Sequence, residues 1–175
     1  MIRFALALIL ALTCGQVLAA EYPTVNVPPS LRQSNWLGSQ GEGSCVHASF
    51  ISLLRWQQRY NTADWWRKTH GNGEWPTSMN QQLDAAKIRY AVTTEGDVAF
   101  LEWAMKTRRG AVITWSPAHA VTLVHLDDKR AGILNNNSVN KIIWQDRDAF
   151  IREWRSRGGW AFTPIYTPAP PLPTK

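Results

Sequence analysis

The chain of 175 residues contains only two cysteines, Cys14 and Cys45. We expect Cys14 to be removed with an N-terminal leader, so a single thiol remains and no internal disulfide can form. An exported protein that keeps one thiol needs another explanation for it. With one cysteine and four scattered histidines, the chain also lacks a closely spaced set of metal ligands, so we expect neither a metal nor another cofactor.

Several short motifs that mark particular chemistries are missing as well. The sequence has no HExxH pair for zinc, no paired CxxC, no GxSxG nucleophile turn and no glycine-rich phosphate loop. It also shows no internal repeat. Function therefore has to be sought in the remaining thiol and its surroundings.

Long apolar runs are scarce, and the one present lies near the N-terminus. Residues 1–20 resemble a secretory signal peptide, with Arg3, a short apolar stretch, and a small-residue cleavage site near Ala19 and Ala20. This predicts a secreted or periplasmic protein. Acylation of Cys14 is the less favoured alternative, because Thr13 is large for a lipoprotein signal. No second long run follows, so we expect no transmembrane segment in the mature form.

Charged residues make up only 18% of the chain and hydrophobic residues 45%, which is typical of a globular protein. About 155 residues would follow the leader, enough for one domain with its own core. The formal net charge is +6. Because this excess is spread along the chain, we expect a basic solvated surface and no nucleic-acid partner. Attraction to anionic cell-surface polymers is equally compatible.

The hydrophobic pattern predicts helices first and mainly strands afterwards, a segregation typical of an α+β fold. We expect an extended arm over residues 21–38, a domain over 39–166 and a disordered proline-rich tail over 167–175. Expected helices are Ser44–Gln58, Thr62–Lys68, Ser78–Lys87, Asp97–Arg109 and Asp146–Gly158. Expected strands are Arg89–Thr93, Ala111–Trp115, Ala118–Leu126, Ala131–Asn135, Asn140–Trp144 and Trp160–Tyr166.

Ten tryptophans are unusually many for a chain of this length. Four occupy core-like positions of expected helices, so packing is their predicted role: Trp56, Trp66, Trp103 and Trp154. Trp75, in a glycine-containing loop, and Trp115, just before His119, are the better candidates for the wall of a substrate cleft.

Cys45 follows a loop rich in glycine and serine and begins an expected helix. Unpaired backbone N–H groups and the helix dipole stabilise a thiolate at such a position. The alternative is a small buried apolar residue. The loop and the expected export favour a nucleophile.

A nucleophilic thiol needs a base and a group that orients the base. His119 opens an expected strand, and Asn135 and Asn136 end the next one, so the pairing of the two strands can bring an amide to the imidazole. Asn135 has the better strand phase, whereas Asn136 fits if one residue is irregular. His125 is the chief rival base, although it lies beside an acidic turn where a surface role is more natural.

Three segments together resemble the papain-like cysteine peptidase superfamily, most closely its compact bacterial C39-like branch: Gln40 to Cys45, His119 to Val121, and Ile133 to Asn136. The resemblance implies helices, with the cysteine at a helix start, packed on a C-terminal antiparallel sheet. It implies Cys45 as nucleophile, His119 as base and then acid, Asn135 or Asn136 as the orienting residue, and Gln40 with the Cys45 backbone N–H as the oxyanion hole.

The expected activity is that of a secreted cysteine peptidase or amidase that hydrolyses amide bonds of a peptide or protein through an acyl-enzyme. Two alternatives stay open. The same residues could cleave cell-wall peptide cross-links, or the domain could be inactive and bind a partner instead.

Overall fold

The computed structural model describes residues 22–23, 25, 27–38, 42–71, 76–116 and 118–166. The expected leader with Cys14, the oxyanion candidate Gln40, the cleft candidate Trp75 and the proline-rich tail all lie outside these ranges. Among the helices in these ranges, none has the length and apolarity required to cross a bilayer.

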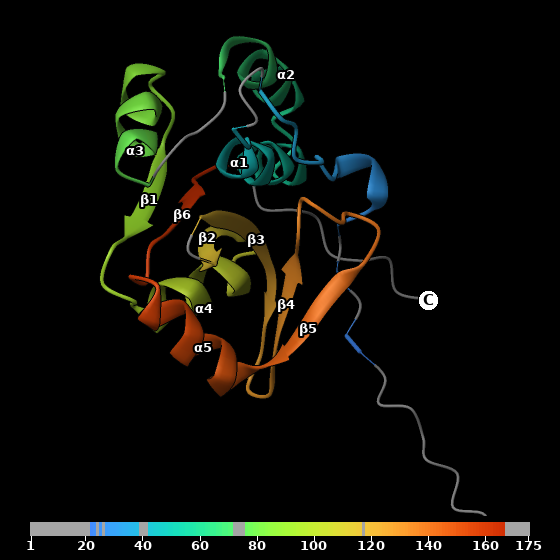
Figure 1. Cartoon of the computed structure of the whole chain (residues 1–175), viewed down its shortest axis with the longest axis vertical. Coiled ribbons are helices and arrows are strands. Elements are labelled where there is room, and N and C mark those ends of the chain that lie inside the picture. The colour runs from blue at the N-terminus through green and yellow to red at the C-terminus, as the bar shows by residue number, and fades with distance from the viewer. Residues whose placement is uncertain are drawn as a thin grey trace, which may run out of the picture.

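A mixed set of early and late strands forms one antiparallel sheet with the order β1-β6-β2-β3-β4-β5 (Figure 1). The strands are β1 (Tyr90–Thr93), β2 (Ala111–Ser116), β3 (His119–Leu126), β4 (Arg130–Leu134), β5 (Ile142–Asp146) and β6 (Ala161–Pro164). Each expected strand is present within two residues at its start. The last strand returns to pair with β1 and β2, so the sheet joins both halves of the chain.

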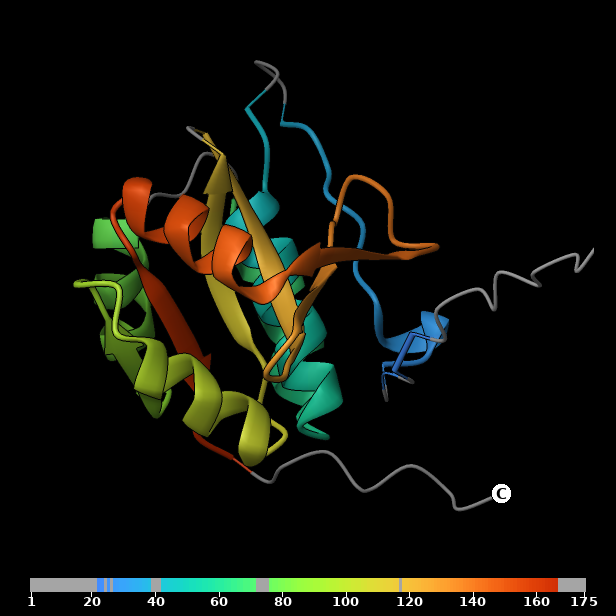
Figure 2. The ribbon, with the colours of Figure 1, turned by 90° about the horizontal axis from the view of Figure 1, so that it is seen from below.

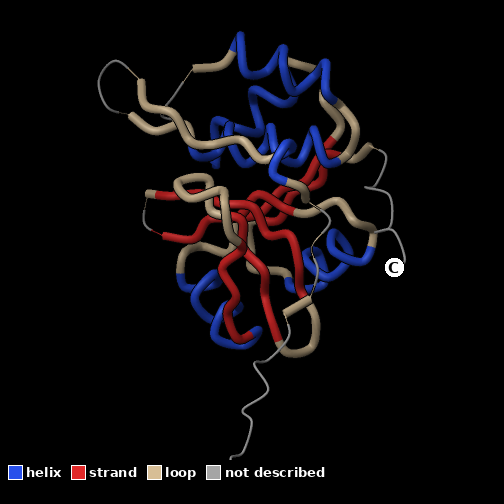
Figure 3. Tube along the Cα trace, turned by 90° about the vertical axis from the view of Figure 1, so that its right-hand side faces the viewer, coloured by secondary structure: helices blue, strands red, loops and turns tan. Residues whose placement is uncertain are grey.

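Helices cover both faces of this sheet. They are α1 (Cys45–Trp56), α2 (Tyr60–Thr69), α3 (Pro76–Ala85), α4 (Val98–Lys106) and α5 (Arg147–Ser156), preceded by a 3₁₀ turn at Pro29–Leu31. Helix α1 packs on one face, and α4 and α5 pack on the other, so the sheet is the middle layer (Figures 2 and 3). The α+β class and the packing of helices on an antiparallel sheet are confirmed.

The alternation of β3 explains why helices lie on both faces. Ala120 and Val124 belong to the core under α1, whereas Val121 and Leu123 belong to the core under α4 and α5. All four are buried. Because successive side chains of a strand point to opposite faces, burial of both sets requires a covering layer on each face of the sheet at β3, which lies between β2 and β4.

Helix α1 lies against the centre of the sheet and runs from the site into the core. Nearly every residue after Cys45 is buried, including Phe50, Leu53 and Leu54, which are fully inaccessible. Because the helix is apolar around most of its circumference, it packs against the sheet on one side and against α2 on another. Its first residue is therefore positioned by a rigid element.

The N-terminal arm packs onto the domain along the α1 side of the sheet. Val27 is 1% exposed and belongs to the α1-side core. The Arg32 guanidinium donates to the Val139 carbonyl at 2.6 Å, and Tyr22 stacks on Trp144 with ring centroids 5.4 Å apart.

One core prediction is wrong. Trp66 and Trp154 are fully buried and Trp56 nearly so, but Trp103 is 38% exposed. Helix α4 faces the sheet with Leu101 and Ala104, and Trp103 lies to the side of that face, where Arg109 stacks against its ring. Trp103 is therefore an apolar residue of the helix that does not belong to the core.

Candidate active site

Cys45 is the first residue of α1, and its side chain is half-buried. The preceding Ser44 does not cap the helix with its side chain, because its hydroxyl is bonded to Asn35 and Trp36 instead. The first N–H groups of α1 are therefore left without a side-chain cap. One of them, from Val46, donates to the Cys45 sulfur, and the N–H of Ala120 donates to the same sulfur at 3.4 Å.

His119 is the first residue of β3, which lies against α1, and its imidazole is hydrogen-bonded to the Cys45 thiol. On the other side of the ring, Nε2 lies 3.0 Å from Asn135 Oδ1. Asn135 directly follows the end of β4, the strand that pairs with β3. The strand pairing thus brings together three residues that are far apart in the sequence.

The tautomer of His119 follows from the other partner of Asn135. The backbone N–H of Asn137 donates to Asn135 Oδ1 at 2.9 Å, so this atom is an acceptor, as the amide oxygen must be. His119 Nε2 therefore carries the hydrogen and donates to it. This leaves Nδ1 to accept the thiol proton.

The electrostatics of the pair favour the charged form. Burial by itself raises the pKa of the Cys45 thiol, but the hydrogen bonds from His119 and from the Ala120 and Val46 N–H groups, with the imidazolium charge, lower that pKa below its ordinary value. The bond to Cys45 raises the pKa of His119 above its ordinary value against the opposing effect of burial, and the bond to Asn135 adds to the rise.

Asn136, the other amide candidate, does not contact the imidazole. Its side chain points inward, is 3% exposed, and donates to the carbonyl oxygens of Cys45 and Ala120. The choice between the two amides depends on where β4 ends. Asn135 comes directly after Leu134, the last residue of the strand, so no irregularity intervenes there.

The other histidines take part in different contacts. His125 is bonded through Nε2 to Asp127 at 2.8 Å, which lowers the pKa of Asp127 to about 2. A bulge between Leu123 and His125 also changes the strand phase that would place His125 on the face of His119. His47 is buried and its Nδ1 accepts from the indole N–H of Trp66 at 2.9 Å.

Trp115, a proposed cleft wall, is half-buried and packs against the core on the α4 and α5 side. Because Gln40 and Trp75 lie outside the described residues, the structure gives no position for either candidate.

Two features of the site had no signal in the sequence. The N–H of Ala120 is a backbone group, and its role as a donor to sulfur depends on the approach of β3 to α1. Asn35, on the arm, accepts from the Ser44 N–H at 2.8 Å and donates from Nδ2 to Asn137 Oδ1 at 2.9 Å. It therefore joins the start of α1 to the loop that carries Asn135.

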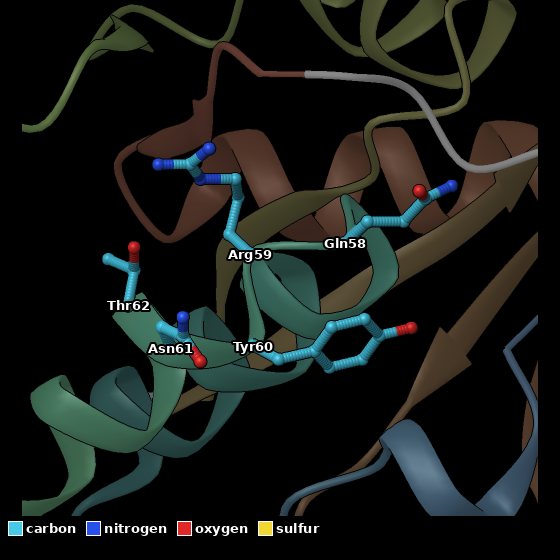
Figure 4. A pocket seen from close by; sticks show the side chains of 5 residues that line it. All are labelled: Gln58, Arg59, Tyr60, Asn61 and Thr62. Carbon is cyan, nitrogen blue, oxygen red and sulfur yellow. The ribbon is translucent and has the colours of Figure 1, made fainter.

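A pocket of about 180 Å³ lies elsewhere, at the turn between α1 and α2 (Figure 4). Its lining residues are Gln58, Arg59, Tyr60, Asn61 and Thr62. They follow the C-terminal end of α1, whereas Cys45 begins that helix, so the pocket is about 18 Å from the thiol along the helix axis. It is no part of the site. Within the described ranges, no group of three or more histidine, cysteine, aspartate or glutamate side chains is placed to hold a metal ion.

Comparison with known proteins gives one informative likeness. No protein-family model and no curated protein matches the chain. A solved structure that does match is the crystal structure of a double glycine motif protease from an AMS/PCAT transporter, in complex with the leader peptide. It has 18% sequence identity and a TM-score of 0.50, over 77% of this chain and 94% of that one. The chain therefore shares the α+β fold of that protease, with helices packed on an antiparallel sheet.

Proposed function

We propose that the protein is a cysteine peptidase that hydrolyses peptide bonds through an acyl-enzyme formed on Cys45. The observation that carries this proposal is the continuous hydrogen-bonded series from the Cys45 thiol through the His119 ring to Asn135 Oδ1. A thiol at a helix start, a base within bonding reach and a group that orients the base are together what nucleophilic acyl transfer requires.

In the first half of the reaction, the Cys45 thiolate attacks the carbonyl carbon of the scissile bond. The carbon–nitrogen bond then breaks as protonated His119 gives its proton to the departing amine, which leaves a thioester on Cys45. In the second half, His119 takes a proton from water, the hydroxide attacks the thioester, and the acid product leaves with the thiol regenerated.

Negative charge on the carbonyl oxygen needs donors near the start of α1. The Cys45 backbone N–H has no carbonyl four residues earlier within the helix, which begins at that residue. We assign it as one donor and Gln40 as the other, as the family resemblance implies.

A peptide is the substrate class best supported. The double glycine motif protease with the same fold was solved with a leader peptide. We further propose, from the signal at residues 1–20, that the mature protein acts outside the cytoplasm.

The experiment is labelling and digestion with matched variants. Purified protein lacking residues 1–20 is treated with a peptidyl vinyl sulfone and, separately, with a complex peptide mixture analysed by mass spectrometry. Wild type is expected to be labelled on Cys45 and to cleave peptides, whereas Cys45→Ala and His119→Ala do neither. His125→Ala is the control, because it removes a histidine of the same strand that is bonded to Asp127 and not to the thiol.

Peptide cleavage that persists in Cys45→Ala, or a wild type that is neither labelled nor active on any peptide, would overturn the proposal. Purified peptidoglycan, assayed in parallel, distinguishes general peptide substrates from cell-wall cross-links.

A further inference from the structure

Asn136 lies where the three elements of the candidate site meet. Its side-chain Nδ2 is 2.9 Å from the Cys45 carbonyl oxygen on α1, 2.8 Å from the Ala120 carbonyl oxygen on β3 and 2.9 Å from Ser49 Oγ on α1. We propose that Asn136 is a positioning residue that sets the separation of the Cys45 thiol and the His119 imidazole. This inference rests on the proposed function and assigns a second task to the asparagine pair.

The contacts form a closed ring around the nucleophile. The N–H of Ala120 donates to the Cys45 sulfur, the carbonyl of the same residue accepts from Asn136, and Asn136 also donates to the Cys45 carbonyl. Ala120 is the neighbour of His119, and β3 is the element that carries the base. A change in Asn136 therefore alters the relative position of α1 and β3 at the level of the thiol.

These contacts are made by the side-chain nitrogen of Asn136 and not by its oxygen. Two of the three acceptors are carbonyl oxygens, which cannot donate, so the nitrogen must face them. The oxygen of the same amide is buried and has no hydrogen-bond partner among the described residues. Asn136 is thus held through its N–H groups, and an isosteric side chain without them would not preserve the ring.

The loop that carries Asn136 is itself fixed from the arm. The backbone N–H of Asn35 donates to the Asn136 carbonyl at 2.8 Å, and the Asn35 side chain bonds both Ser44 and Asn137. The backbone of Asn136 is therefore anchored on one side and its side chain on the other.

Two consecutive asparagines consequently have separate tasks. Asn135 turns its oxygen toward the imidazole and holds its tautomer, whereas Asn136 turns its nitrogen inward and holds the two elements that carry the thiol and the base.

The test compares Asn136→Leu, which keeps the approximate size and removes both donors, with Asn136→Ser, which keeps one donor. The control is Gln57→Leu. Gln57 is also fully buried and also bonded to several groups, but it lies just beyond the other end of α1, where it holds Arg109 and Tyr166. The measurements are the rate of Cys45 alkylation by iodoacetamide as a function of pH, kcat and KM on a cleaved peptide, and the melting temperature.

We expect Asn136→Leu to move the pH profile of Cys45 alkylation to higher pH by about one unit, a tenfold change in the ionisation constant of the thiol, and to lower kcat more than it raises KM. Asn136→Ser should give a smaller change in the same direction. Gln57→Leu should lower the melting temperature and leave the pH profile unchanged.

If both Asn136 variants keep the wild-type pH profile and kcat, or if Gln57→Leu changes them equally, Asn136 is not a positioning residue. Should Asn136→Leu not fold, Asn136→Ser decides by the same criterion. A wild-type thiol that titrates at its ordinary pKa would instead contradict the proposed function, so the two failures are distinct.

Discussion

At the scale of single residues, the arrangement depends on which atoms of Asn135 and Asn136 face which partners. Asn135 Oδ1 is bonded by His119 Nε2 and by the Asn137 N–H, so the imidazole is held in one tautomer and one orientation. A histidine that takes the proton of a thiol must point its unprotonated nitrogen at the sulfur. The contact with Asn135 Oδ1 holds the His119 ring in an orientation that allows this. In the proposed reaction, Asn135 would therefore contribute to reactivity by orienting His119 and without touching the substrate.

Substitution of Asn135 should separate orientation from charge. Asn135→Ala removes the acceptor, and we expect kcat/KM to fall by roughly 10²-fold with little change in melting temperature, since the residue is only half-buried. Asn135→Asp keeps an acceptor and adds a negative charge near the ring, which raises the pKa of His119 further. Its pH–rate profile should retain activity to higher pH than wild type, because the imidazolium persists longer.

A peptide-hydrolysis series over pH measures both effects. Equal activity of Asn135→Ala and wild type, or an alkaline limb that Asn135→Asp moves to lower pH, would contradict the orienting role.

The sequence predicts Cys45 and His119 as the candidate nucleophile and base, but it leaves open which asparagine faces the imidazole. Cys45 and His119 each begin a regular element, and periodicity together with glycine content locates such starts. Which asparagine faces the ring depends on a single residue at the end of β4 and on the turn that follows. Those details are determined by pairing with β3 and by the contact with Asn35.

At the scale of elements, the helices on the far face of the sheet begin as the sequence predicts. Asp97 accepts from the Ala99 N–H, and Asp146 accepts from the Ala149 N–H, each at 2.9 Å. A side-chain oxygen at this position satisfies a backbone donor that the helix leaves unpaired. Both aspartates precede an apolar helical period, so local sequence was sufficient to predict them.

Replacing either cap with alanine should lower the free energy of unfolding by about 1 kcal/mol. Activity should be unchanged, because α4 and α5 pack on the sheet face opposite α1. Urea unfolding of Asp97→Ala and Asp146→Ala, with the exposed turn residue Asp128→Ala as control, checks this. Cap variants no less stable than the control would contradict the assignment.

The element boundaries that sequence reasoning missed are set by tertiary contacts. Helix α2 starts at Tyr60, two residues before the expected cap at Thr62, and ends at Thr69. Trp103 was assigned to the core because its helix is apolar at several adjacent positions, and only the docking of α4 by Leu101 and Ala104 determines which face is buried. The hydrophobic period predicts that a helix forms. Which side of that helix is buried depends on how it packs against the sheet.

At the scale of the whole molecule, α1 and α2 are joined by a buried histidine. His47 is 1% exposed, accepts from Trp66 on α2, and lies 5.8 Å from His70, which stacks on the same indole. Burial, and secondarily the charge of His70, lower the pKa of His47 to about 4. Protonation of His47 is thus coupled to the packing of the two helices.

The sign of the pH dependence follows from the lowered pKa. Between about pH 4 and 6.5 the unfolded chain binds a proton that folded His47 does not, so stability should fall as the pH falls through that range. The loss is on the order of 3 kcal/mol when complete. His47→Gln, which keeps an acceptor for Trp66, should flatten this part of the curve.

Urea unfolding across that pH range, in a Cys45→Ala background that removes the thiol–imidazole pair, gives the measurement. An identical pH dependence in His47→Gln would exclude His47 as its source. His125→Gln is the matched control, because it changes another histidine without changing the α1–α2 contact.

The course of the chain as a whole was only partly predictable. The class and the strand order around β3 and β4 follow from hairpin patterns, which are local. The return of β6 between β1 and β2, and the docking of the arm through Val27 and Arg32, are contacts between distant segments. Nothing in the residues of one segment specifies its distant partner, so these contacts had no local signal.

The central proposal is that the Cys45 thiol and the His119 imidazole act together as nucleophile and base, and NMR titration of the histidine rings tests their interaction most directly. The chain has four histidines, so the ring signals can be assigned by substitution. The account predicts that His119 titrates above its ordinary pKa in wild type and returns toward that value in Cys45→Ala, which removes its hydrogen-bonded partner. A His119 that titrates identically with and without the thiol would contradict the account.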